Sequence, residues 1–152
     1  MKIIDGTNYL EEVKELIIVY TKFLNRNLDF QGLEDELKDL SGKYSGQEGE
    51  ILAALSDDNK IMGIVAYHRH NDKRCEMKRL FVKPEYRKLK LGEKLISEII
   101  NHAKQKGYKE MVLDTIEPLK AAIHLYKKFG FVECEPYYNN PMNDVIYMKL
   151  EL

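Results

Sequence analysis

One stretch of the sequence decides the fold: Arg79-Leu80-Phe81-Val82-Lys83-Pro84-Glu85-Tyr86-Arg87-Lys88-Leu89-Lys90-Leu91-Gly92-Glu93-Lys94-Leu95. It predicts an apolar strand, a turn marked by proline, a basic loop with one glycine, and then a helix. A strand that leads through a turn into a helix leaves unpaired backbone N–H groups at the positive end of the helix dipole. Such an arrangement binds phosphate groups, and the interleaved lysines and the arginine add positive charge around it. The stretch therefore predicts a site for the pyrophosphate of a cofactor.

The composition indicates an ordinary globular protein with one domain over residues 1–152. The 152 residues are 44% hydrophobic and 32% charged, which suits a chain with a full core. The formal net charge of -1 argues against nucleic acid or an anionic membrane as a partner. No apolar run approaches the roughly 20 residues that span a bilayer, and the N-terminus does not resemble a signal peptide. Cys75 and Cys134 match neither a disulfide framework nor a metal motif, which favours reduced thiols in a cytoplasmic protein.

The order of the predicted elements indicates an α/β fold. Strands at residues 51–55, 61–67 and 74–82 are separated by short turns, which favours an antiparallel meander. Helices and short apolar strands then alternate from residue 74 to residue 132, and residues 145–150 form a closing strand. This β-α-β-α-β order predicts parallel pairing at the middle of a mixed sheet, with helices on both faces.

Two helices and a loop are predicted ahead of these strands. Apolar residues from 10 to 24 follow helical spacing and predict a first amphipathic helix. Leu33, Leu37 and Leu40 predict a shorter second helix. Residues 41–50 contain three glycines and predict a mobile loop with Tyr44 at its centre.

Two segments match motifs of a known enzyme family. The first, from Val82 to Gly92, contains Arg87-x-x-Lys90-x-Gly92, and the second, from Ala122 to Phe131, contains the pattern Leu-Tyr-x-x-x-Gly-Phe. They resemble the acetyl-CoA motif (Gln or Arg, then x-x-Gly-x-Gly/Ala) and the downstream tyrosine segment of the GNAT superfamily of N-acetyltransferases. The predicted elements follow the GNAT order over nearly the whole chain. The resemblance implies a GNAT fold and an acetyl-CoA-dependent N-acetyltransferase that uses no metal.

The resemblance also implies where acetyl-CoA binds. The arm of the cofactor would pair with the strand before the loop as an added strand, and its pyrophosphate would rest on amides of the loop and the helix. The residues implied for cofactor binding are Leu80, Phe81, Val82, Arg87, Lys88, Leu89, Lys90, Leu91, Gly92, Glu93 and Lys94. Two positions depart from the family. Lys90 replaces the first glycine, which costs backbone freedom if a positive φ is needed there, and Leu119 replaces an asparagine that contacts the cofactor.

In this family the substrate amine attacks the thioester directly, so few catalytic groups are needed. The resemblance implies that Tyr126 protonates the departing coenzyme A thiolate, and a phenol is protonated at neutral pH. Packing of its ring is an alternative role. Glu76 stands at the spacing of the general base of histone-type members, where a half-buried carboxylate could have a raised pKa. A salt-bridged Glu76, with a water chain as base, is the alternative. His68 and His70 form an ordinary polar face rather than a metal site.

The acceptor is expected to contact variable loops. Tyr44, the segment Tyr137-Tyr138-Asn139-Asn140, His68 and Arg69 are candidates for contacts with a small-molecule or peptide amine, and ordinary surface is their alternative. A non-catalytic acyl-CoA-binding regulatory module is the alternative function, which Lys90 and Leu119 favour and Tyr126 opposes. Family members are often dimers, so a homodimer is a further expectation from the resemblance.

Overall fold

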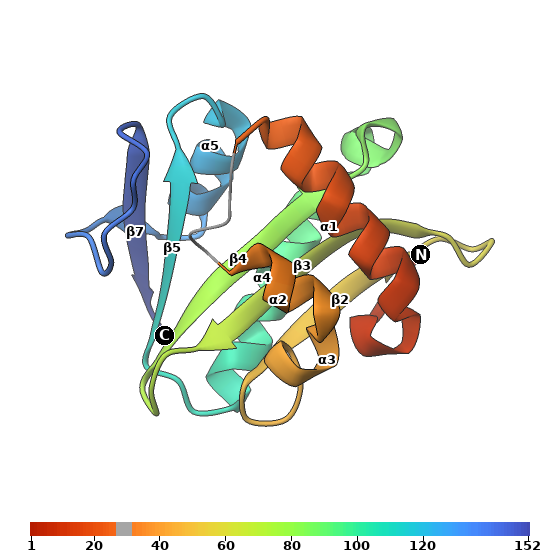
Figure 1. Cartoon of the computed structure of the whole chain (residues 1–152), viewed down its shortest axis with the longest axis horizontal. Helices are drawn as coiled ribbons and strands as arrows, with labels where there is room; N and C mark the ends of the chain where they lie inside the picture. Colours follow the sequence, from red (N-terminus) through yellow and green to blue (C-terminus); the bar gives the residue numbers. More distant parts are fainter. Residues whose placement is uncertain (27–31) are drawn as a thin grey trace.

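In the part of the chain that the structure describes, residues 1–26 and 32–152, seven strands form one mixed sheet (Figure 1). This computed structural model has the strand order β1-β2-β3-β4-β5-β7-β6. The strands are β1 (Lys2–Asp5), β2 (Gly49–Leu55), β3 (Ile61–Arg69), β4 (Arg74–Val82), β5 (Glu110–Ile116), β6 (Val132–Glu133) and β7 (Val145–Glu151). The predicted mixed α/β sheet is confirmed.

Helices cover both faces of the sheet (Figure 1). On one face lie α1 (Leu10–Leu24), which follows a 3-10 turn at Gly6–Tyr9, and the short helices α2 (Leu33–Lys38) and α3 (Leu40–Lys43). The opposite face carries α4 (Leu91–Gln105) and α5 (Lys120–Lys128), and a 3-10 helix, Pro84–Leu89, leads from β4 into α4. Glycines with positive φ end both of these helices, Gly107 at +94° and Gly130 at +100°.

Each face of the sheet has its own apolar core. Alternation along β3 shows this directly, because Ile64 packs on the α1 side and Val65 on the α4 side. The apolar stripe of α4 is fully buried, with Leu95 and Ile99 both at 0% exposure. None of the helices in the described residues combines the length and the apolar composition needed to cross a membrane.

The pairing of the strands confirms part of the predicted topology. β2, β3 and β4 form the expected antiparallel meander, and β4 pairs with β5 in parallel. The expected parallel pairing does not extend to β6, because β7 lies between β5 and β6 and is antiparallel to both. The reason is length: β7 pairs with β5 along seven residues, from Glu110 to Ile116, whereas β6 has two residues.

β4 contains a bulge that opens the sheet. The register between β3 and β4 shifts between Ile64 and Ala66, and Arg79 has a left-handed φ of +62°. β4 pairs with β5 over Arg74–Glu76, and beyond these residues the two strands diverge in Figure 1. The divergence creates the space in which the candidate site lies.

A buried ion pair ties α2 to this bulge. Arg79 donates from Nε and Nη2 to the two carboxylate oxygens of Glu36, each at 2.9 Å, and Lys43 Nζ lies 2.7 Å from Oε1. Burial opposes the ionisation of Glu36, but the hydrogen bonds and charges of Arg79 and Lys43 outweigh it and lower its pKa to about 2. The bulge therefore has a charged anchor on the α1 face.

Of the predictions ahead of the strands, the second helix is confirmed in part and the place of Tyr44 is wrong. The helix is present as α2 but divides at Asp39, whose carboxylate accepts a hydrogen bond from the Gly42 amide at 3.0 Å and starts α3. Tyr44 is 1% exposed rather than central to a loop, because its ring packs with Leu40 and Ile51 in the core beneath α1. Tyr44 is therefore a core residue, and the predicted loop already enters β2 at its last two positions.

Candidate active site

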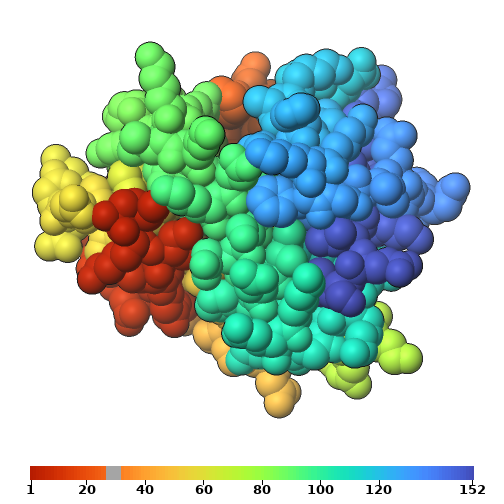
Figure 2. Space-filling model, turned by 180° about the vertical axis from the view of Figure 1, so that it is seen from behind, coloured from red at the N-terminus to blue at the C-terminus, as the bar shows by residue number. Residues whose placement is uncertain are grey.

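An apolar groove opens beside the N-terminus of α4. Figure 2 shows this face, where the segment leading into α4 (green) lies next to α5 (blue). The groove is lined by Tyr20, Phe23, Leu80, Phe81, Val82, Arg87, Lys90, Gly92, Glu93, Pro118, Leu119, Lys120, Ala121, Ala122 and Leu125. Seven residues predicted to bind the cofactor are among them. The side chains of Lys88, Leu89, Leu91 and Lys94 lie outside the lining, and Leu91 is buried in the core.

Lys90 shapes the start of α4. Its φ of +58° is left-handed, which is the conformation that a glycine would adopt without strain. Its side chain does not cap the helix, so the first-turn amides of α4 keep their capacity to bind an anion. The backbone at position 90 therefore has the positive φ at which we expected, from the sequence, a lysine to lose backbone freedom relative to glycine.

Arg87 is held at the end of β4 rather than over the amides of α4. Its Nε donates to the Val82 carbonyl at 3.1 Å, and its guanidinium lies 5.1 Å from the ring centre of Phe23 and 5.5 Å from that of Phe81. The side chain therefore occupies a backbone acceptor on the strand edge that was predicted to pair with the cofactor arm.

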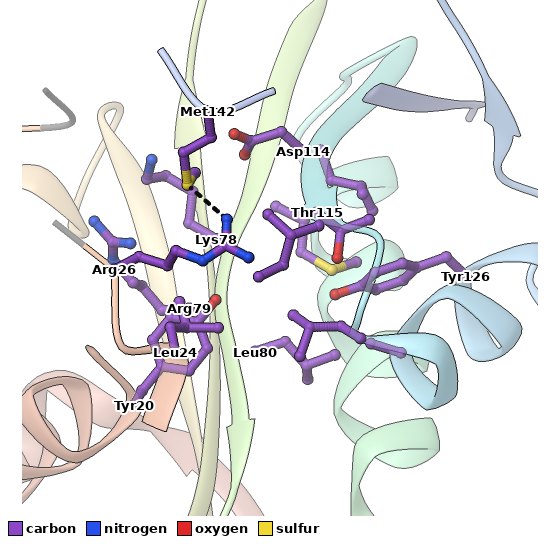
Figure 3. Close-up of a pocket in the computed structure, with 15 residues that line it drawn as sticks. Tyr20, Leu24, Arg26, Lys78, Arg79, Leu80, Asp114, Thr115, Tyr126 and Met142 are labelled. Carbon is purple, nitrogen blue, oxygen red and sulfur yellow. Dashed lines mark hydrogen bonds between the residues drawn. The ribbon is translucent and has the colours of Figure 1, made fainter. Parts of the chain in front are cut away.

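A second cavity lies between the diverging ends of β4 and β5 (Figure 3). We call this space the wedge cavity. It is adjacent to the apolar groove, because four residues line both spaces: Tyr20, Leu80, Leu119 and Ala122. In Figure 3 the hydroxyl of Tyr126 points from α5 toward this space, beside Thr115. Burial raises the pKa of Tyr126, which keeps the phenol protonated at neutral pH.

Asp114 brings a carboxylate to the same cavity. It accepts hydrogen bonds from the hydroxyl of Tyr138 and from Asn140 Nδ2, the latter at 3.1 Å. Burial raises the pKa of Asp114, and these hydrogen bonds oppose the rise. The sequence reasoning missed Asp114 and Thr115, although a polar pair directly after the apolar run Met111–Leu113 marks the carboxyl end of a central strand, where ligands bind in α/β sheets.

Glu76, on β4, lies in a separate cavity that we call the polar pocket. This pocket is lined by Lys43, His68, His70, Arg74, Glu76, Lys78, Tyr137 and Tyr138. His70 Nε2 is 2.8 Å from its Oε1, the Tyr137 hydroxyl donates to Oε2 at 3.1 Å, and Lys78 Nζ lies 3.6 Å from Oε2. Burial favours the protonated form, but the hydrogen bond from His70 and the charge of Lys78 outweigh it and lower the pKa of Glu76 to about 2. The expectation of a raised pKa is therefore wrong, because the carboxylate is surrounded by donors.

The sequence of this chain also matches the model of a known family. The model of the GNAT acetyltransferase family matches residues 15–131, which include the groove, the bulge and Tyr126. An uncharacterised N-acetyltransferase of Schizosaccharomyces pombe is 44% identical over 144 residues, covering 94% of this chain and 88% of that protein. The chain belongs to the GNAT acetyltransferase family.

Solved GNAT structures share the fold. A GNAT acetyltransferase of Staphylococcus aureus aligns with a TM-score of 0.82 at 24% identity, over 99% of this chain and 98% of that one. A GNAT acetyltransferase of Elizabethkingia anophelis, solved with acetyl-CoA bound, aligns with a TM-score of 0.62 at 26% identity, over 77% of this chain and 82% of that one.

Some of the residues predicted to contact the acceptor come together in this GNAT domain and others do not. His68, Tyr137 and Tyr138 line the polar pocket, and Asn140 bonds to Asp114 at the wedge cavity. Arg69 instead forms an exposed ion pair with Asp72 in the turn after β3.

Cys75 is buried, and burial raises the pKa of its thiol to about 12, so it remains protonated at neutral pH. Among the described residues, no group of three or more His, Cys, Asp or Glu side chains is arranged to hold a metal ion.

Proposed function

We propose that this chain transfers the acetyl group of acetyl-CoA directly to a primary amine of a small molecule or peptide. The observation that carries the proposal is the wedge cavity, which places the protonated phenol of Tyr126 and the carboxylate of Asp114 beside an apolar groove at the start of α4. The acetyl-CoA bound by the Elizabethkingia relative supports the choice of cofactor.

The groove fits the chemistry of acetyl-CoA. An uncapped helix N-terminus with Lys90 and Lys94 in its first residues suits a pyrophosphate, and the apolar lining from Leu80, Leu119 and Leu125 suits the arm of the cofactor. Arg87 would have to release the Val82 carbonyl for the arm to pair there. When bound, acetyl-CoA supplies an activated thioester.

The residues of the wedge cavity supply the proton transfers of the reaction. Asp114, with its raised pKa, accepts a proton from the substrate ammonium, directly or through a water, and frees the nitrogen lone pair. As the new C–N bond forms and the C–S bond breaks, the electron pair leaves with sulfur and Tyr126 donates its proton to that thiolate. The second proton, which the acylated nitrogen loses, passes to the Tyr126 phenolate and restores the phenol, whose raised pKa favours the protonated form. Glu76 remains the alternative base, but a carboxylate with a pKa of about 2 is a weak proton acceptor.

The test is coenzyme A release from acetyl-CoA against a panel of amines, amino acids and peptides. We expect amine-dependent release, and we expect Asp114→Asn to lower kcat by about 100-fold or more, with Glu76→Gln lowering it less. A larger loss for Glu76→Gln would return the base role to Glu76. Tight acetyl-CoA binding with no acceptor in the panel would contradict the proposed transfer.

A further inference from the structure

We infer that the acceptor amine carries a carboxylate, and that the polar pocket holds this carboxylate while the amine lies in the wedge cavity. The inference rests on the proposed function and names the substrate class of the same site. The pocket lies on the face of the sheet that α2 and α3 cover (Figure 1), and it is lined by residues of α3, β3, the turn after β3, β4 and the loop before β7. Its charge, its free donors and its connection to the wedge cavity each support the inference.

The lining of the polar pocket has an excess of positive charge. Lys43, Arg74 and Lys78 contribute ammonium and guanidinium groups, and His68 and His70 add imidazoles, whereas Glu76 is the acid of the lining. Burial lowers the pKa of His68, and the charges of Lys43 and Lys78 lower it further, which is the effect of a positive field. An anionic group entering this pocket would be attracted to it.

Two of these cations keep unused hydrogen-bonding capacity. Arg74 gives its Nε proton to His70 Nδ1 at 3.1 Å, and its guanidinium lies 5.7 Å from the ring centre of Tyr137, but no carboxylate pairs with it among the described residues. Lys78 is 10% exposed at its side chain and lies 3.6 Å from Glu76, which is longer than a hydrogen bond.

Glu76 does not satisfy these donors, because Lys78 Nζ lies 3.6 Å from its Oε2 and Arg74 directs its Nε proton to His70. The Oε1 atom of Glu76 is hydrogen-bonded to His70 Nε2, and its Oε2 atom accepts a hydrogen bond from the Tyr137 hydroxyl. A planar carboxylate from the substrate would complete the pocket, since guanidinium and ammonium groups bind carboxylates through short, charge-assisted hydrogen bonds.

The polar pocket is connected to the wedge cavity through two residues. Lys78 lines both spaces. Tyr138 lines the polar pocket and donates to Asp114, which lines the wedge cavity. One short molecule can therefore place an ammonium at Asp114 and a carboxylate at Lys78, as an amino acid or a short peptide would. A second ammonium, as in a diamine or polyamine, would meet the cations of the pocket and be repelled.

The experiment compares matched sets of acceptors by coenzyme A release. Each set holds an amino acid, its carboxamide and the amine left after removal of the carboxyl group. We expect kcat/KM for the amino acids to exceed that of both partners by about tenfold or more, as for one hydrogen bond to a charged group. Lys78→Met and Arg74→Met should each reduce this preference with the KM for acetyl-CoA unchanged. Lys73→Met, at an exposed lysine of the neighbouring turn, is the matched control and should keep the preference.

Each outcome decides the matter. Carboxamides or decarboxylated amines acetylated as well as the amino acids would overturn the inference and leave the proposed function standing. No release with any member of any set would overturn both. If Lys78→Met fails to fold, Arg74→Met alone carries the test, because Arg74 is at the start of β4 and only partly buried. An equal loss of rate for all three members of a set in that variant would assign Arg74 a structural role.

Discussion

The apolar groove and the polar pocket lie at two ends of one path through the domain, yet they are built differently. Seven of the fifteen residues that line the groove come from one continuous segment, residues 80–93, and the others come from α1 and from residues 118–125. The polar pocket combines side chains from α3, β3, β4 and the loop before β7, brought together by strand register. The first region can be found as a motif, whereas the second exists only after the sheet has formed.

The largest expected effect comes from the residue between the two regions. Tyr126→Phe should lower kcat by about 100- to 10,000-fold, the usual range for a general acid, while acetyl-CoA binds with nearly unchanged affinity. Steady-state kinetics and calorimetric titration measure the two quantities. The control is Tyr108→Phe, which removes the hydroxyl of another buried tyrosine, in the segment between α4 and β5. An unchanged kcat for Tyr126→Phe would reduce Tyr126 to a packing residue of α5.

Removing the charged anchor of the bulge should lower the free energy of unfolding more than removing an exposed ion pair does. Glu36→Gln leaves Arg79 buried beside a neutral amide and should cost about 3–5 kcal/mol of unfolding free energy in urea titrations. Glu34→Gln, whose carboxylate lies 3.8 Å from Lys38 on the surface, should cost less than about 1 kcal/mol. Equal losses for the two variants would show that the bulge needs no charged anchor.

The same carboxylates set the pH dependence of stability. Glu36 and Glu76 have folded-state pKa values of about 2 against an ordinary value of 4.5, so the folded state favours their ionised forms. Their contribution is fully present above about pH 5 and is lost as the pH falls toward 2. Thermal unfolding should therefore show a falling Tm over that window, with a shallower fall in Glu36→Gln.

The smallest expected effect concerns the groove. Lys90→Ala keeps a side chain at a positive φ and removes the charge, whereas Lys90→Gly removes both the strain and the charge. The glycine variant should be more stable than the alanine variant by about 1 kcal/mol. Both should weaken acetyl-CoA more than a truncated thioester without the pyrophosphate. Equal losses for the two thioesters would place Lys90 away from the phosphates.

Sequence patterns could predict the groove because its chemistry is local. The strand, the basic loop and the start of α4 are contiguous, and Tyr126 lies in a recognisable segment. The bulge was not predictable in this way, since Arg79 adopts its left-handed φ without a glycine or proline to mark it. Tyr44 was misplaced because its neighbouring glycines indicate a loop, while burial of its ring depends on distant residues. Asp114 and the lowered pKa of Glu76 likewise depend on partners that are far away in the sequence.

In the proposed complex, acetyl-CoA lies in the apolar groove with its thioester at the wedge cavity, and a thermal shift with a filled-cavity variant tests this placement most directly. Ala122 lines both the groove and the wedge cavity, so Ala122→Trp should block the path, whereas His124→Trp on the exposed side of α5 should not. At a hundredfold excess of acetyl-CoA over its Kd, we expect the Tm of the wild-type protein and of His124→Trp to rise by about 5–10 °C, with no rise in a folded Ala122→Trp. No rise in the wild-type protein, or an equal rise in Ala122→Trp, would contradict the account.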